Sequence, residues 1–274
     1  MAIISVTMGS HSGAESMVEH IASQLGMRSA SREVLIEAAK TFNVPEGKVA
    51  QVFEKTPSFW ERMTESRRTY LAYIQAQLAE WTRDDNLIYH GNGGQELLRE
   101  IPHVLKVRMI VPWEKRIALT MEHMKFSREH AERYVEELDE SRTRRMRYLF
   151  NADWRDPSRF DVVINLERVA PEHAEQMIIE LSRHPEFQLQ EHQRARFNDF
   201  LIRCRVYAML AGALVGRLSL ITVTVQEGVV TLQGTLTSHE SMIEPLVEDI
   251  RNMEGVSSVN NEIVVGLVYH EWNV

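Results

Sequence analysis

Several features that mark other classes of protein are scarce or missing in this chain of 274 residues. There is one cysteine, Cys204, so an internal disulfide framework and a multi-cysteine metal site are both excluded. The longest apolar stretch, around residues 207–214, is too short to span a bilayer, which needs about 20 apolar residues. No basic leader precedes the apolar N-terminal residues, so they are predicted to form a first strand and not a signal peptide. We therefore expect a soluble, cytoplasmic protein.

An excess of positive charge is missing as well. The chain has 31 lysines and arginines against 39 aspartates and glutamates, a formal net charge of −8. This balance argues against a general binder of nucleic acid or of anionic membranes. Hydrophobic residues make up 44% of the chain, which is enough to bury a sizeable core, and the length favours about two domains.

Strand-like and helix-like segments alternate through the first two-thirds of the chain. Apolar runs typical of strands lie at residues 3–7, 87–89, 103–111 and 161–165. Helical spacing of apolar residues predicts helices over residues 17–25, 32–41, 57–81, 112–121, 127–150 and 171–183, with Ser127 as an N-cap. Strands separated by helices predict an α/β fold with a mainly parallel sheet covered on both faces. Because ligands bind beyond the carboxyl ends of such strands, we expect the site in the loops after Thr7, Tyr89 and Val111.

The turn after the first predicted strand has the outline of a phosphate-binding loop. Its residues Gly9, Ser10, His11, Ser12 and Gly13 precede a helix, and the N–H groups of such a turn favour an anion. The full signature is G-x-x-x-x-G-K-[ST], in which a lysine and a hydroxyl follow the last glycine. In the register that matches Gly13, Met8, Ala14 and Glu15 hold the positions of the first glycine, the lysine and the hydroxyl.

These replacements leave two interpretations of the loop open. An alanine supplies no charge for a transferring phosphate, and a glutamate repels phosphate, although Glu15 could help to hold a metal ion. The motif alone is compatible with phosphate binding and equally with an ordinary turn between a strand and a helix. No cluster of histidines, cysteines or carboxylates has metal-ligand spacing, so any Mg²⁺ is expected to arrive with a nucleotide.

An arginine-rich segment follows in the long predicted helix that starts after Ser127. Arg142 and Arg145 are three residues apart and so share one helix face. A nucleotide kinase needs cations that close over the phosphates and exclude water, and this pair fits that requirement. The alternative is a solvated helix face whose arginines pair with neighbouring carboxylates.

The last third of the chain has a different pattern of predicted helices and strands. A polar stretch over residues 188–198 leads into a helix predicted to end near Gly216. Two alternating strands, residues 221–225 and 229–234, are joined by a Glu-Gly turn and predict a hairpin. A helix over residues 238–253 and a strand over residues 258–265 complete a small α+β unit.

The first part of the chain, over roughly 185 residues, resembles the cytidylate kinase-like branch of the nucleoside monophosphate kinases. The most specific stretch is residues 153–165, which closely match the family signature D-W-x-D-P-x-x-Y-D-x-V-I-N. The other points of resemblance are residues 8–13, Ser31-Arg32-Glu33-Val34-Leu35, Gly91-Asn92-Gly93 and residues 101–107. The family usually has Gly-Arg-Gly where Asn92 stands here, and Asp-Arg-Glu where Ser31 begins the motif.

This resemblance implies a P-loop fold and a nucleotide site. It implies that Gly9 to Glu15 hold donor phosphates, with ATP and Mg²⁺ as cofactors and a CMP-like nucleotide as acceptor. It places Arg32 and Asn92 at the nucleotide or phosphate, and Arg142 and Arg145 in a lid with a catalytic role. The branch commonly lacks the loop lysine, so Ala14 does not by itself exclude activity.

The C-terminal unit resembles a BON domain over approximately residues 200–267. The matching residues are Val223, Val225, Gly228, Val230, Leu232, Gly234, Gly255, Val256, Val259 and Asn261. BON domains are generally binding modules without catalytic residues. The resemblance therefore implies a protein partner or self-association, with lipid binding less favoured because no export signal is seen.

We predict a kinase-like domain over residues 1–187 and a BON-like domain over residues 198–268. Three functional hypotheses remain. The first is a cytidylate kinase-like phosphotransferase with a degenerate phosphate loop. The second is an inactive nucleotide sensor that acts through the BON-like domain, and the third is a P-loop scaffold that binds nothing at this site.

Overall fold

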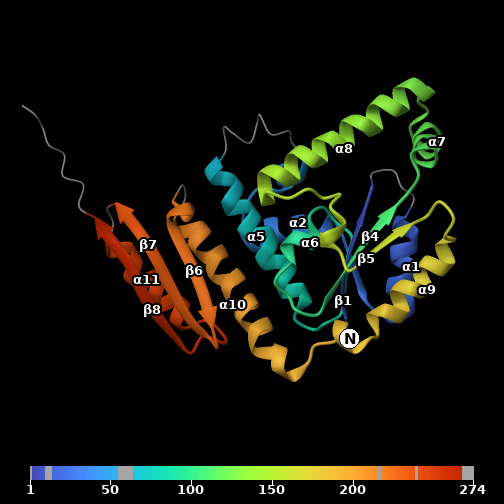
Figure 1. Ribbon diagram of the computed structural model, residues 1–274. Helices are drawn as coiled ribbons and strands as arrows, with labels where there is room; N and C mark the ends of the chain where they lie inside the picture. The colour runs from blue at the N-terminus through green and yellow to red at the C-terminus, as the bar shows by residue number, and fades with distance from the viewer. Residues whose placement is uncertain (1, 10–13, 55–63, 215–216, 238–239, 267–274) are drawn as a thin grey trace, which may run out of the picture.

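The computed structural model describes residues 2–9, 14–54, 64–214, 217–237 and 240–266 (Figure 1). Its first sheet has five parallel strands in the order β2-β3-β1-β4-β5. They are β1 (Ile3–Met8), β2 (Arg28–Ala30), β3 (Leu87–Tyr89), β4 (Val104–Ile110) and β5 (Val162–Asn165). The central strand β1 is buried along its whole length, as its β-branched and apolar residues predict. The predicted parallel sheet is confirmed.

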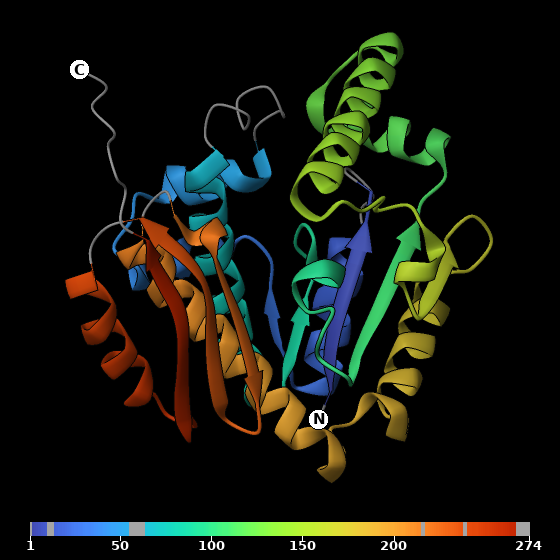
Figure 2. The same ribbon diagram turned by 60° about the vertical axis from the view of Figure 1, so that its left-hand side comes forward.

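Helices cover both faces of this sheet and extend beyond its carboxyl edge. On one face lie α1 (Glu15–Leu25) and α9 (Pro171–Ser182), which pack on the even-numbered residues of β1 such as Ile4 and Val6. The opposite face carries α2 (Glu33–Thr41), α3 (Glu46–Glu54), α5 (Thr64–Thr82) and the short α6 (Gly94–Leu97). Beyond the carboxyl ends of the strands stand α7 (Trp113–Met124) and α8 (Arg128–Phe150) (Figure 2).

The limits of α8 follow from local sequence. Ser127 accepts a hydrogen bond from the backbone N–H of His130 at 3.3 Å, so the predicted N-cap is confirmed. At the other end Asn151 adopts a left-handed conformation with φ of 51°, and its N–H bonds back to the carbonyl of Arg147. These two caps set the length of the helix that covers the site.

A second, smaller sheet follows α10 (Glu191–Ala213). Its strands β6 (Ile221–Gln226), β7 (Val229–Thr237) and β8 (Ser258–Gly266) lie in that order, with β6 antiparallel and β8 parallel to β7. The predicted hairpin is confirmed, and its turn has positive φ at both Glu227 and Gly228. The helix α11 (Glu240–Arg251) connects β7 to β8.

The two sheets share a continuous hydrophobic core through α10. This helix lies between the small sheet and α5, and buried residues from all three belong to one cluster (Figures 1 and 2). Ion pairs tie the same elements together: Arg205 with Glu80 at 2.7 Å, and Arg83 with Glu254. The domain limits at residues 187 and 198 remain predictions, and α10 is a packed element rather than an exposed linker.

Three short elements escaped the sequence analysis. The edge strand β2, α3 and α6 have three, nine and four residues, too few for a clear apolar period. Three 3₁₀ turns, at Pro157–Arg159, Pro185–Phe187 and Leu218–Leu220, complete the order. The helix predicted from residue 57 is seen from Thr64, and its first part lies outside the described residues. Among the helices of the described ranges, none combines the length and apolar character that a membrane span requires.

Candidate functional site

A cavity of about 500 Å³ opens at the carboxyl ends of β1, β2 and β3. The strand order reverses beside β1, because β2 and β3 lie on one side of it and β4 and β5 on the other. In α/β folds, ligands bind at the carboxyl ends of the strands at such a point. Among the residues that the structure describes, the charged side chains that line it are Glu15, Arg32 and Arg142, and two histidines, His90 and His123, line it as well. The remaining lining residues are Thr7, Met8, Gly9, Ser31, Leu35, Phe53, Tyr89, Gly91, Asn92, Gly93, Gln95, Tyr134, Leu138, Met146 and Trp154.

One face of α8 forms the upper wall of the cavity. Tyr134, Leu138, Arg142 and Met146 are spaced four residues apart and all line it. This spacing places successive side chains above one another on a single helix face. Arg145 lies one residue before the last of them and is not among the described residues that line the cavity. The structure therefore directs Arg142 towards the ligand space.

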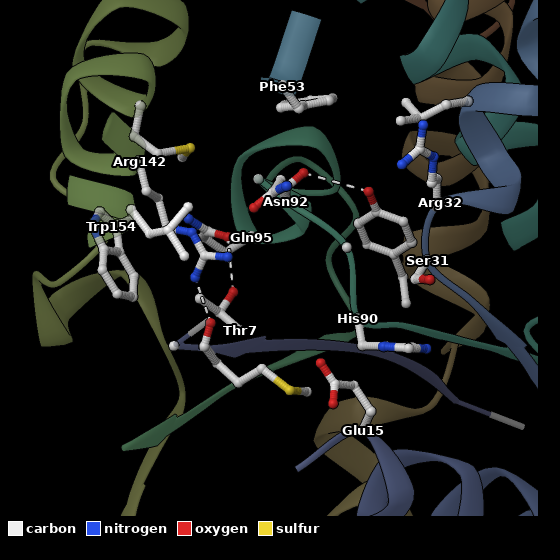
Figure 3. Close-up of a pocket in the computed structure, with 18 of the residues that line it drawn as sticks. Thr7, Glu15, Ser31, Arg32, Phe53, His90, Asn92, Gln95, Arg142 and Trp154 are labelled. Carbon is white, nitrogen blue, oxygen red and sulfur yellow. Dashed lines mark hydrogen bonds between the residues drawn. The ribbon is translucent and has the colours of Figure 1, made fainter. Parts of the chain in front are cut away.

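Arg142 links this helix to the end of β1. Its Nη1 donates a hydrogen bond to the carbonyl oxygen of Met8, and its guanidinium lies 4.9 Å from the ring centroid of Trp154 (Figure 3). Trp154 is held in turn, because its indole N–H donates to the hydroxyl of Thr143 at 3.0 Å. Burial lowers the pKa of Arg142 to about 10, which leaves the side chain charged at neutral pH.

A second arginine lies beside the start of the predicted phosphate loop. Arg116, on α7, is 7% exposed and pairs with both carboxylate oxygens of Asp139 at 2.7 and 2.8 Å. A Cβ built on Gly9 would lie 3.1 Å from the Arg116 guanidinium, so glycine gives the two groups room to approach. This partly buried pair joins α7 to α8 next to the end of β1.

Arg32 occupies the opposite side of the cavity from Arg142 (Figure 3). It stands at the start of α2, where Glu33 accepts a hydrogen bond from the backbone N–H of Ser31 at 2.7 Å. That bond lowers the pKa of Glu33, so its carboxylate remains charged at neutral pH. The same bond stabilises the turn before the helix. The cavity thus has a guanidinium on each of two facing walls.

The glycine-rich turn after β3 is shaped by Tyr89. This tyrosine is 1% exposed, and burial raises the pKa of its hydroxyl, which donates to the carbonyl of Asn92 at 3.4 Å. A Cβ on Gly91 would collide with the Tyr89 ring and hydroxyl, so the turn can fold over the ring only without a side chain there. The turn places Asn92 on the cavity lining, between Arg142 and Arg32 in the view of Figure 3.

His90 has structural partners beside the cavity. Its Nε2 lies 3.3 Å from the hydroxyl of Ser29 and 3.5 Å from a carboxylate oxygen of Glu19. Ser29 also donates to Glu19 at 2.6 Å. His103 is fully buried and pairs with Asp85 at 2.7 Å. These two residues lie just before β4 and β3, at the amino ends of the strands and away from the cavity. The serine and the carboxylate contact the same nitrogen of His90, so the carboxylate does not orient the ring for catalysis by the hydroxyl.

The structure brings together most of the predicted site residues that it describes. Gly9, Glu15, Arg32, Asn92 and Arg142 all line the cavity. Ala14, at the predicted lysine position, is 1% exposed and precedes α1. Ser10, His11, Ser12 and Gly13 lie outside the described residues. Within the described part of the chain, no group of three histidines, cysteines or carboxylates could hold a metal ion.

Sequence reasoning missed several residues around the cavity. Thr7, Gln95, Tyr134 and Leu138 line it, and Arg116 with Asp139 supports it. The four-residue spacing on the α8 face was visible in the sequence and could have identified Tyr134 and Leu138. The positions of Gln95 and Arg116 depend on contacts between distant segments, for which the sequence carries no signal.

Comparison with known proteins agrees with this architecture. The cytidylate kinase-like family profile matches residues 3–168, and the BON domain profile matches residues 198–266. No protein of curated function matches the chain.

Solved structures with similar folds match about two-thirds of this chain. An uncharacterized protein from Eubacterium ventriosum is 16% identical, with a TM-score of 0.52, and the match covers 66% of this chain and 97% of that one. Shikimate kinase from Acinetobacter baumannii, in complex with shikimate, is 16% identical with a TM-score of 0.40, covering 66% and 92%. Dephospho-CoA kinase from Campylobacter jejuni is 14% identical with a TM-score of 0.35, covering 67% and 98%.

The family match spans more than half of the chain, and the strand order and the cavity agree with it. The chain belongs to the cytidylate kinase-like family, with a kinase-type P-loop fold followed by a BON domain.

Proposed function

We propose that this protein is a phosphotransferase of the nucleoside monophosphate kinase type, with ATP as donor and a CMP-like nucleotide as acceptor. The observation that carries the proposal is the cavity at the carboxyl edge of the sheet, with Arg32 and Arg142 on facing walls. Phosphoryl transfer depends on positioning and on stabilising negative charge, and two facing guanidiniums meet both requirements.

The proposed roles divide between two sides of the cavity. Gly9 and Glu15 are on the donor side, while Arg32 and Asn92 face the acceptor. Arg142 stands at the end of β1, where it stabilises the charge of the transferred group. Arg145 keeps its predicted lid role on the same helix.

A magnesium ion fits the donor side of this site. Mg²⁺ usually takes one or two carboxylates and completes its shell with phosphate oxygens and water. Among the described lining residues Glu15 supplies one carboxylate, at the loop position where a hydroxyl is usual. Bound there, the ion would neutralise phosphate charge, and Glu15 would hold it instead of repelling the phosphate.

The second candidate function is a nucleotide sensor without catalysis. It is favoured by Ala14, which is buried at the lysine position and offers the phosphates no charge. It is also favoured by the shared core, which joins α5 beside the cavity wall to the BON domain. In this case the BON domain would report nucleotide binding to a protein partner or to a second copy of the chain.

Calorimetric titration with ATP, GTP, CMP and CDP, with and without Mg²⁺, tests whether the cavity binds nucleotide. We expect binding in the wild type and a loss of about tenfold to hundredfold in Arg142→Ala, because a charge-assisted hydrogen bond to phosphate is removed. Arg144→Ala is the matched control, since Arg144 is an exposed arginine on the same helix that pairs with Glu140.

Two results would oppose the proposal. An absence of binding at millimolar nucleotide would exclude both the enzyme and the sensor. Equal affinities of wild type, Arg142→Ala and Arg144→Ala would show that the nucleotide binds elsewhere.

A further inference from the structure

The side chain of Gln95 lines the cavity, and only the oxygen of its amide has a hydrogen-bond partner among the described residues. Thr7 donates its hydroxyl hydrogen to Oε1 of Gln95 at 3.0 Å, and both residues are buried, at 7% and 2% exposure. The Nε2 of Gln95 is buried as well and has no hydrogen-bond partner among the described residues. Gln95 lines the cavity close to Arg142 (Figure 3).

Two glycines bring Gln95 to this position. Gly93 has φ of +74°, a left-handed conformation that turns the chain after β3. A Cβ on Gly94 would lie 2.5 Å from the hydroxyl oxygen of Ser5 and 2.6 Å from the Tyr89 ring, so the turn lies directly on β1 and β3. Ser5 and Thr7 point to the same face of β1, and the residue after Gly94 therefore meets Thr7.

A buried amide donor without a partner is unusual in a folded protein. Most buried polar groups are hydrogen-bonded, and leaving one unsatisfied destabilises the folded state. Here the orphaned donor is held in a fixed orientation by Thr7 and lines the cavity that we assign to the ligand. A bound molecule with a hydrogen-bond acceptor at this point would satisfy it.

The surroundings indicate which kind of acceptor fits. Arg142 lies on the same side of the cavity, and Gly9, where the predicted phosphate loop begins, also lines it. A donor beside a guanidinium favours an anionic oxygen over a neutral carbonyl or a base nitrogen. The chemistry therefore matches a non-bridging phosphate oxygen.

We propose that Gln95 is a phosphoryl-binding residue whose Nε2 donates to an oxygen of the phosphate group bound beside Arg142. This inference rests on the proposed nucleotide site and adds to it a residue outside the phosphate-loop motif. A neutral donor at this position would replace part of the contact that a loop lysine makes, since the side chain of Ala14 carries no charge.

Gln95→Glu tests the inference with almost no change of shape. The carboxylate can still accept from Thr7, but it removes the donor and places a negative charge against the phosphate. We expect the affinities for ATP and for inorganic triphosphate to fall about tenfold to hundredfold. The affinity for cytidine, which has no phosphate, should stay within twofold of the wild type. Gln95→Met, which removes the amide at similar volume, should weaken the same two ligands less.

The chain supplies a matched control in a second threonine–glutamine pair. Thr41 donates to Oε1 of Gln77 at 2.8 Å, and Gln77 is 8% exposed. Gln77 is not among the described residues that line the cavity. Gln77→Glu should leave all three affinities unchanged. Thermal unfolding of each variant, monitored by circular dichroism, should show that the Gln95 variants remain folded at the temperature of the titration.

The inference would be overturned if Gln95→Glu bound triphosphate as tightly as the wild type, because an acceptor would then suffice at this position. It would also be overturned by an equal loss for cytidine and triphosphate, which would indicate a purely structural role. If the wild type bound neither ATP nor triphosphate, the proposed function itself would fail, and this result is distinct from either of the others.

Discussion

Removing residues 188–274 should leave residues 1–187 without a cooperative thermal transition. The reason is the core shared through α10, which packs along α5. Tyr73 of α5 illustrates the contact: it is 5% exposed and stacks on Phe42, and a Cβ on Gly212 of α10 would lie 3.2 Å from its hydroxyl. Uncovering each large apolar side chain costs about 1.5–3 kcal/mol.

Several such losses together approach the whole stability of a typical domain, about 5–15 kcal/mol. The measurement is thermal unfolding of the fragment and of the full chain by circular dichroism and by calorimetry. Co-expression with a fragment of residues 188–274 should restore a cooperative transition, because the two halves of the core would meet again. A fragment 1–187 that melts cooperatively within a few degrees of the full chain would show that the two domains are energetically independent.

The second large effect is expected for Asp139→Ala. Asp139 neutralises Arg116, which is 7% exposed, through two hydrogen bonds at 2.7 and 2.8 Å. Removing Asp139 takes away the carboxylate that accepts both of these hydrogen bonds from a buried guanidinium, and the loss of such a charged hydrogen-bond partner costs about 1–3 kcal/mol. Urea denaturation of wild type and variant measures this loss directly.

Glu140→Ala is the control for that substitution. Glu140 is the next residue of α8 and pairs with Arg144 at 3.0 Å on the exposed surface, where an ion pair contributes about 0–1 kcal/mol. The double variant Arg116→Met/Asp139→Leu should recover much of the lost stability, because it removes both charges of the pair and keeps apolar side chains in their place. If Asp139→Ala cost no more stability than Glu140→Ala, the pair of Arg116 and Asp139 would contribute no more than an exposed ion pair does.

The parts of the fold that the sequence predicted well are those set by local signals. Ser127 could be identified as an N-cap from its position before a helical pattern, and the strands around Ile4, Ile88 and Leu105 from their apolar runs. The family resemblance added the signature around Trp154, which supports Arg142. Each of these signals lies within a short window of residues.

The parts that could not be predicted depend on contacts between distant segments. The place of Gln95 in the cavity depends on the turn at Gly94, which lies on Ser5 of β1, 89 residues earlier in the chain. Arg142 and Arg145 were equivalent by spacing, and only the packing of α8 directs the former into the cavity. The docking of α10 on α5 likewise followed from tertiary packing, since its apolar residues alone did not identify a partner.

Transfer of the labelled γ-phosphate of ATP to CMP, dCMP or UMP in the presence of Mg²⁺ tests the proposed phosphotransferase activity. We predict formation of the labelled nucleoside diphosphate by the wild type, reduced by at least tenfold in Arg142→Ala and unchanged in Arg144→Ala. Tight nucleotide binding with no diphosphate formed from any of these acceptors would contradict the phosphotransferase and leave the nucleotide sensor as the function.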